Sequence, residues 1–517
     1  MNHHINMTNF LKALINFLFM SALLSFSGGT NEPFKKKNTT EKKLPNVLIL
    51  TVDDMAYNSV GVYGCKIPGI TPNIDQLASE GIRFTNAFTN TAVCQPCRQT
   101  LLTGRYPHNN GAEGFEPISL DVPTLSEQLK KAGFINGILG KETHHQPVEK
   151  FSWDYIPFMT EKDSVWRNGS ARNPGLFKTY AATFFTMAKA QGKPFLLIAN
   201  SEDPHRPFVG SSEDTTTFRN RLPPVTRQFS PGNIDVPGYL PDIADVRKET
   251  AQYYGSVYRA DQSIGAVLDA LNNSGMAENT IVIFLSDHGA AFPFSKSQCY
   301  LNSNKVPLIV KWPHRIKAGV NDSKHFVSGI DLMPTVLEAL GLPSVEDVDG
   351  RSFLPLLFGK KQDERNEVYT TYYQIFAKVR YPMRCLQDQK FGYIYNFWSD
   401  GELSMSGDAT VGLTWKAMVR AAGSDAEIAR RVALYRHRVP EEFYDIQNDP
   451  DALHNLVNDP AYAEEIERFR ARMLTVMKSC KDPALEAYRD KDKQGTIKEF
   501  MKQQKIKSGL TGRNAHF

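Results

Sequence analysis

The chain has 517 residues, of which 41% are hydrophobic and 22% charged, and its formal net charge at neutral pH is +4. This composition is ordinary for a globular protein, and the length is sufficient for one large domain with a smaller one beside it. The small net charge, without a basic stripe or a nucleic-acid motif, argues against nucleic acid as a partner.

The N-terminus has the layout of a secretory signal peptide. Lys12 precedes an apolar run over residues 13–26, which small residues follow. The run is short for a membrane-spanning helix, so we expect a signal peptide over residues 1–28, an exported protein and no stable membrane span. An N-terminal anchor is the alternative. Residues 29–44 are polar and rich in lysine, which predicts a flexible tether.

Apolar strands alternate with helical segments in the first two thirds of the chain. Continuous apolar, β-branched runs predict strands buried on both faces over residues 46–52, 134–139, 194–199, 280–285 and 306–310. Apolar residues at helical spacing predict helices over residues 74–80, 125–132 and 251–271. We therefore expect an α/β domain with a mostly parallel central sheet flanked by helices.

The sequence pattern changes after about residue 365. Short aromatic-rich runs predict antiparallel strands, and a last helix is expected over about residues 464–479. We expect a large α/β domain over residues 45–370, a smaller antiparallel C-terminal subdomain over residues 371–485 and a mobile, lysine-rich tail over residues 486–517.

Acidic and basic residues follow four of the predicted strands. They are Asp53 and Asp54 after the first, Lys141, His144 and His145 after the second, His205 after the third, and Asp287 and His288 after the fourth. The carboxyl ends of parallel strands meet at one edge of a sheet, where ligands bind. The aspartates, with His288 as a further ligand or a hydrogen-bond donor, could hold one cation such as Ca²⁺ or Mg²⁺.

The segment CQPCRQTLLTGR, residues 94–105, carries the most specific pattern. We expect it to enter a helix with Cys94 near the N-terminus, where a thiol would have a lowered pKa. The C-x-x-C spacing also permits a redox or zinc pair, but neither a second C-x-x-C nor a thioredoxin-like context accompanies it.

This segment resembles the signature of the sulfatase family, C-x-P-C/S-R followed by T-G-R. The resemblance covers nearly the whole chain, through PNVLILTVDDM, GILGK, DPHRP, IVIFLSDHG and FYDIQNDPDALHNL. AAFPFSK after DHG, and YPMRC over residues 381–385, are most similar to the heparan N-sulfatase (sulfamidase) branch. The resemblance implies an alkaline-phosphatase-like sulfatase fold.

The resemblance also implies the residue roles. A maturation enzyme would oxidise Cys94 to formylglycine, whose hydrate is the nucleophile and is held by Arg98. One Ca²⁺ would be bound by Asp53, Asp54, Asp287, His288 and the residue at position 94. The residues implied to bind sulfate or act on the leaving group are Lys141, His205 and Lys296. The family places a histidine two residues after the lysine, whereas here the order is Lys-Glu-Thr-His-His. We favour His144 as catalytic and His145 as substrate-binding.

A sulfated sugar is the expected substrate, most closely N-sulfoglucosamine of heparin or heparan sulfate, with an O-sulfated glycan as the alternative. Arg384 is a candidate sugar contact or else a surface arginine, and Phe397 and Trp398 could stack on a sugar ring or pack in a core. The other classes are a phosphoester or phosphonate hydrolase, disfavoured by the single metal set, and a non-catalytic glycan-binding protein, disfavoured by the complete residue set. Export implies the periplasm of a Gram-negative bacterium, or the lysosome or secretion in an animal.

Overall fold

The computed structural model describes residues 44–160, 169–218, 222, 224–399 and 401–509. The predicted signal peptide and all but the last residue of the predicted tether lie outside these residues. From Leu44 onward the chain forms one compact unit. Within the described part, no helix combines the length and apolar character needed to cross a membrane.

The central sheet confirms the predicted parallel strands. In the described residues it has seven strands in the order β4-β5-β1-β6-β7-β2-β8. β1 (Asn46–Val52) runs parallel to both of its neighbours, β5 (Phe195–Ser201) and β6 (Thr280–Ser286), and β4 (Ile135–Leu139) runs parallel to β5. β7 (Leu308–Lys311) is antiparallel to β6 and to β2 (Ile82–Phe84), which pairs in parallel with β8 (Val320–Asp322). The sheet is therefore mostly parallel, as expected.

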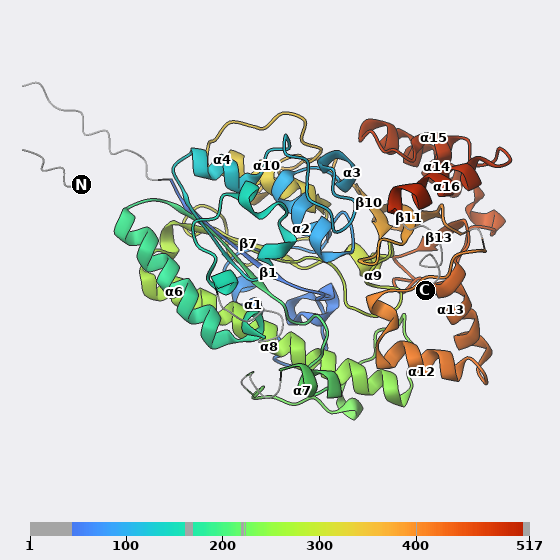
Figure 1. The fold of residues 1–517 in the computed structure, drawn as a ribbon, viewed down its shortest axis with the longest axis horizontal. Coiled ribbons are helices and arrows are strands. Elements are labelled where there is room, and N and C mark those ends of the chain that lie inside the picture. The colour runs from blue at the N-terminus through green and yellow to red at the C-terminus, as the bar shows by residue number, and fades with distance from the viewer. Residues whose placement is uncertain (1–43, 161–168, 219–221, 223, 400, 510–517) are drawn as a thin grey trace, which may run out of the picture. The chain divides into compact units, whose positions relative to one another are not determined.

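Helices cover both faces of this sheet (Figure 1). One face carries α1 (Pro72–Ser79), α6 (Pro174–Gln191) and α8 (Ala244–Ser274), and the other carries α2 (Cys94–Thr103), α4 (Leu125–Lys131) and α10 (Leu332–Ala339). Alternate residues of β1 belong to different cores: Leu48 packs in the cluster of α6 and α8, and Ile49 in that of α2 and α10. This two-sided burial is why the strand reads as a continuous apolar run.

The predicted antiparallel part is a second sheet with the order β10-β11-β12-β13. Its strands are β10 (Glu367–Gln374), β11 (Arg380–Asp388), β12 (Phe391–Asn396) and β13 (Glu441–Asp445). The helices after it are α12 (Leu413–Ala421), α13 (Ala426–His437) and α14 (Ala463–Ser479). β10 begins before residue 370, and its side chains share one hydrophobic core with α8. The boundary between the two predicted domains stays a prediction.

The segment predicted as a mobile tail instead contains α15 (Leu485–Arg489) and α16 (Thr496–Ser508). Met501 is buried, Gln504 accepts a hydrogen bond of 2.7 Å from Arg380, and Lys507 lies 2.8 Å from Glu113. This corrects the expectation for residues 486–509. The apolar side chains of α16 pack on the C-terminal sheet, a signal masked in the sequence by its many lysines. Residues 510–517 lie outside the described residues.

The other short elements in the described residues are β3 (Ala87–Phe88), β9 (Val327–Ser328), α3 (Pro107–Asn110), α7 (Ser212–Phe218), α9 (Leu301–Asn304) and α11 (Leu354–Leu357).

Candidate active site

The carboxyl ends of β1 and β6 bring the predicted acidic residues together. Val52 pairs with Ser286 in the parallel register, so Asp53 and Asp287 follow neighbouring strands at the same level. Asp54 has a positive φ of 67°, a conformation that aspartate tolerates better than most residues, and its backbone N–H donates to Asp287 Oδ1 at 3.0 Å. All three carboxylates are fully buried.

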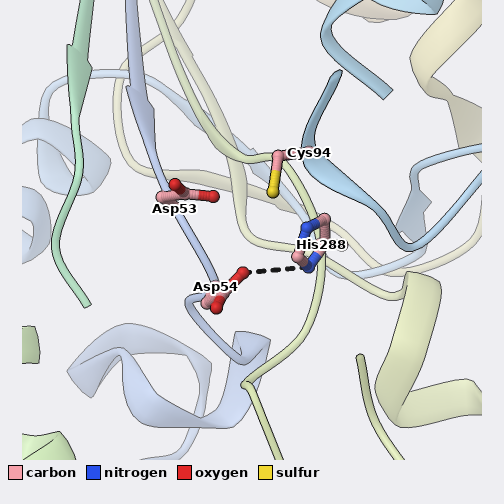
Figure 2. Close-up of side chains that lie close together, drawn as sticks. All are labelled: Asp53, Asp54, Cys94 and His288. Atoms are coloured by element: carbon pink, nitrogen blue, oxygen red, sulfur yellow. Dashed lines mark ion pairs between the residues drawn. The ribbon is translucent and has the colours of Figure 1, made fainter. Parts of the chain in front are cut away.

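Four side chains of this edge converge on one point. One ligand atom each from Asp53, Asp54, Cys94 and His288 lies within 4.8 Å of the others. Figure 2 shows the thiol of Cys94 pointing between Asp53 and His288, whose Nδ1 lies 3.4 Å from Asp54 Oδ1. Asp287, expected in the same set, borders this group: its Oδ2 lies 3.7 Å from His288 Nε2 and 3.0 Å from Arg98 Nη2.

The donor set fits a divalent cation. Both carboxylate oxygens of Asp53, Asp54 Oδ1 and His288 Nε2 are buried and receive no hydrogen bond from the described residues. Lys141 and Lys296 offset part of the negative charge, and a bound cation would satisfy the buried oxygen atoms that no hydrogen bond reaches. Burial and the charge of Asp53 raise the pKa of Asp287, as expected of acids that share one buried site.

Cys94 is the first residue of α2, as predicted, and is buried. The expected lowering of its pKa is wrong: burial raises the pKa of this thiol well above its ordinary value, and Asp53 adds to the effect. Removal from water outweighs a helix dipole that contributes about 0.3–1 kcal/mol. Burial raises the pKa of Cys97 as well, and its thiol donates to the carbonyl of Asp287 at 2.8 Å. Two buried, protonated thiols are poorly suited to redox or zinc chemistry.

Arg98 ties α2 to the sheet. Its Nη1 donates to Thr51 at 2.7 Å and to Asn200 at 2.8 Å, and its Nη2 donates to Asp287 at 3.0 Å. These partners lie on β1 and β5 and directly after β6. Although burial opposes it, the charges of Asp287 and Asp53 raise the pKa of Arg98, so it stays a cation one helical turn from Cys94.

Lys141, Lys296 and His205 surround the acidic cluster. Lys141 forms an ion pair with Asp53, and Lys296 Nζ lies 3.0 Å from Asp54. Gly140, with a φ of 76°, positions Lys141, since a Cβ there would lie 2.4 Å from the carbonyl oxygen of Asn200. His205 Nδ1 donates to the carbonyl of Arg206 at 2.6 Å, which leaves Nε2 directed toward Asp54 at 4.0 Å.

The two adjacent histidines have different environments. Burial, and next the charge of Lys141, lower the pKa of His144 well below its ordinary value, and its buried Nδ1 has no hydrogen-bond partner among the described residues. His145 has a structural role. Its Nδ1 donates to the carbonyl of Lys141 at 3.0 Å, and its ring packs against Phe151 and Trp153. The geometry favours His144 at the site and does not support the substrate-binding role expected of His145.

Arg384 does not support its expected role as a sugar contact either. Its guanidinium is buried, forms a two-fold ion pair with Asp482 at 2.7 and 3.0 Å, and donates further to the carbonyls of Tyr372 and Met383. It is not a surface arginine, since Asp482 from the segment after α14 holds it inside. Phe397 and Trp398 are also fully buried, so they pack in the core.

Replacing Asp482 with asparagine is expected to lower the free energy of unfolding by about 3–5 kcal/mol, because Arg384 would keep its charge in a buried site without a counter-charge. Urea denaturation measures the change. Glu364→Gln is the matched control: Glu364 pairs with Arg351 at the surface, 89% exposed, and its loss should cost about 0–1 kcal/mol. Unchanged stability with a raised KM for a sulfated saccharide would restore Arg384 as a substrate residue.

Sequence reasoning missed two groups at the mouth of the site. Asp408, in the loop before α12, lies 3.0 Å from Lys296. Phe376, in the β10–β11 turn, is 73% exposed and packs edge-on against Phe115, which packs edge-on against His144. Neither follows a strand of the central sheet, so strand-end patterns could not reveal them.

A sheet of this topology, with an acidic cluster and buried cations at the carboxyl ends of its strands, forms a site suited to a bound cation and an anionic group. The sulfatase family model matches residues 45–342, and the family model described as N-sulphoglucosamine sulphohydrolase, C-terminal, matches residues 288–404. The chain belongs to the sulfatase family, and it is a hydrolase of sulfate esters or sulfamates. Enzymes of this family generally use formylglycine and a metal.

Individual relatives agree with this assignment. An ulvan-active sulfatase of Formosa agariphila is 31% identical over 87% of this chain and 83% of its own length. The human N-sulphoglucosamine sulphohydrolase is 30% identical over 85% of this chain and 91% of its own. A protein solved in complex with its substrate D-glucosamine-2-N,6-O-disulfate has the same fold, with a TM-score of 0.65 at 20% identity over 85% of this chain and 99% of that one.

Proposed function

We propose that this enzyme removes sulfo groups from sulfated saccharides, with formylglycine made from Cys94 and with one Ca²⁺ bound by Asp53, Asp54 and His288. The observation that carries the proposal is the convergence of Cys94 with these ligands inside a ring of buried cations. A sulfo group is anionic and repels nucleophiles, so its hydrolysis requires such a concentration of positive charge.

The cationic and anionic groups of the site have different roles in the proposed reaction. A bound cation would offset the aspartates and lower the pKa of a hydroxyl at position 94. Formylglycine would supply, as its hydrate, two hydroxyls on one carbon, one to attack sulfur and one whose deprotonation releases sulfate. Lys141 holds a sulfuryl oxygen, and Arg98, whose guanidinium donates to Thr51, Asn200 and Asp287, supports the residue at position 94. Although burial opposes it, Asp54 keeps the pKa of Lys296 well above its ordinary value, so Lys296 is protonated beside the leaving atom.

Neutral histidines complete the set as proton acceptors. Burial and the charge of Lys296 lower the pKa of His205, and His144 is neutral for a similar reason. The unpartnered Nδ1 of His144 and the inward-facing Nε2 of His205 can each accept a hydroxyl proton. A general base needs this combination of access to the site and an unprotonated ring nitrogen.

The saccharide part of the proposal is supported by the exposed aromatic edge at the site. The Phe376 and Phe115 rings lie 5.0 Å apart at an interplanar angle of 85°. An exposed phenyl ring near the catalytic groups suits the apolar face of a sugar ring.

Replacing Phe376 with alanine is expected to raise the KM for a sulfated saccharide by about five- to tenfold, because the sugar loses an apolar contact of about 1 kcal/mol. The KM for a small aryl sulfate, which need not reach this turn, should not change. Steady-state kinetics on both substrates checks this, with the equally exposed Leu120→Ala as control. Equal losses on both substrates would contradict a sugar-stacking role.

N-sulfoglucosamine is the proposed substrate, on the strength of the C-terminal family model and the human relative. An O-sulfatase on a sulfated polysaccharide is the second candidate, since the Formosa agariphila relative is described as ulvan-active. Matured enzyme is incubated with N-sulfoglucosamine, glucosamine 6-O-sulfate and ulvan oligosaccharides, with Cys94→Ala protein as blank. Sulfate release with an equal amount of free amine supports N-sulfo cleavage, and sulfate without amine from the O-sulfated sugars supports the second candidate.

We also propose that the protein is exported through residues 1–28. The apolar run and the small residues after it support the proposal. N-terminal sequencing of the mature protein tests it, and an intact Met1 on exported or membrane-bound protein would favour an anchor instead.

A further inference from the structure

Asp408 is a carboxylate at the opening of a site built for anions. Its side chain is 51% exposed, and its Oδ2 lies 3.0 Å from Nζ of the fully buried Lys296. The same Nζ lies 3.0 Å from Asp54 in the acidic cluster. Lys296 therefore connects the floor of the site with its rim, and Asp408 is the acidic group on the outer side.

The loop that carries Asp408 is held in place. Ala409 is buried, and Thr410 Oγ1 accepts a hydrogen bond of 3.1 Å from the backbone N–H of Gly407. At the other end, the buried Glu249 accepts the backbone N–H groups of Leu413 and Thr414 at 2.8 and 2.7 Å. Position 408 is thus fixed by main-chain contacts on both sides and not by its ion pair alone.

Glu249 also connects this loop to the segment after β5 that carries His205. It forms an ion pair with Arg206, the residue next to His205, and Arg206 donates to the carbonyl of Ala291. Asp408 and His205 are therefore carried by segments that brace each other. A rim residue held this firmly can select among substrates, because it cannot move away from an unfavourable group.

A negative charge here is unfavourable for binding a sulfo group unless it contacts another part of the substrate. Lys296, and after it His205, hold the pKa of Asp408 well below its usual range against the effect of burial, so the carboxylate is charged at neutral pH. Without this carboxylate, the positive charge of Lys296 would attract an anionic substrate more strongly. A carboxylate accepts hydrogen bonds from sugar hydroxyls and repels a second sulfate.

We propose that Asp408 determines which substituent is tolerated on the sugar carbon next to the one that carries the scissile sulfo group. Its carboxylate accepts a hydrogen bond from a free hydroxyl at that carbon and repels a sulfate. This inference rests on the proposed function, in which Lys296 contacts the leaving atom. Asp408 lies 3.0 Å from the Nζ of that lysine, so its carboxylate is close enough to the leaving atom to contact a substituent on the neighbouring carbon. In N-sulfoglucosamine the carbons next to the amine-bearing carbon are the anomeric carbon and C3, and the hydroxyl on C3 is the position that can carry a second sulfate.

The test compares N-sulfoglucosamine with its 3-O-sulfated derivative in matured wild-type enzyme, Asp408→Asn and Glu427→Gln. Glu427 is an exposed acid at the start of α13, and Glu427→Gln removes one negative charge at a site outside the loop. In wild type, kcat/KM for the disulfated sugar should be at least about tenfold lower than for the monosulfated sugar. Asp408→Asn should abolish most of this ratio and raise the KM for the monosulfated sugar, while Glu427→Gln should leave both unchanged.

Two kinetic outcomes overturn the proposal. One is a selectivity ratio in Asp408→Asn that equals the wild-type ratio. The other is a shifted pH profile of kcat with unchanged selectivity, which would mean that Asp408 only keeps Lys296 protonated. Calorimetric titration of both sugars into Cys94→Ala protein, with and without Asp408→Asn, separates this inference from the proposed function. Preferential binding of the monosulfated sugar that depends on Asp408 supports the inference even if turnover fails. Equal binding of both sugars overturns the inference alone, and absent binding of both overturns the proposed substrate together with it.

Discussion

Cys94→Ala is expected to lower sulfate release by about 10⁴-fold or more, the scale at which loss of a covalent nucleophile reduces turnover. The thiol itself is buried and protonated, so its native chemistry would not account for catalysis. Peptide mass spectrometry across residue 94, on protein co-expressed with a formylglycine-generating enzyme, should show replacement of the thiol by an aldehyde.

Cys65→Ser is the matched control, because Cys65 is a half-buried thiol in the loop after β1 and takes no part in the site. It should keep both conversion at Cys94 and wild-type turnover. Full activity of Cys94→Ala, or activity of wild-type protein whose Cys94 stays a thiol, would contradict the formylglycine proposal. The nucleophile would then have to be sought elsewhere at the same strand edge.

Chelation of divalent cations, or Asp54→Asn, is expected to lower turnover by about 10³-fold or more, since the charge that offsets the buried aspartates is lost. Added Ca²⁺ at about a hundred times its Kd should stabilise the wild-type fold by about 2.7 kcal/mol. Thermal denaturation with and without Ca²⁺ measures this difference, which Asp54→Asn should abolish. Asp269→Asn, which removes a carboxylate exposed on α8, should leave it intact.

The same experiment has a pH dependence. Burial and Asp53 raise the pKa of Asp287 above its unfolded value, so without a cation the native state binds the extra proton. The metal-free protein should therefore lose stability as the pH rises from the unfolded pKa toward the raised native one. A Ca²⁺ ion held beside Asp287 would favour its charged carboxylate, so the stabilising effect of Ca²⁺ should grow over the same range. A Ca²⁺ effect that is equal at mildly acidic and mildly alkaline pH would contradict this coupling.

The strand pattern was readable because the parallel strands are buried on both faces. Residues 46–52 have no polar face to interrupt the apolar run, and the predicted bounds agree with β1. The acids after β1 and β6 were readable for the same reason, since parallel register brings strand ends to one edge. α16 could not be predicted from the sequence, because its few apolar residues are spread among lysines and the sheet that it packs on is distant in the sequence.

By itself, the sequence determined the α/β class, the sulfatase-type segment at residues 94–105 and most of the residues now found around it. Only the tertiary structure decided which of two adjacent histidines faces the site, that Arg384 is paired with Asp482 inside the C-terminal part, and that the Cys94 pKa is raised. It also brought Asp408 and Phe376 to the rim. The physical reason is that strand-end residues are positioned by local periodicity and register, whereas burial, charge pairing and rim contacts depend on how loops of the second sheet fold back onto the first.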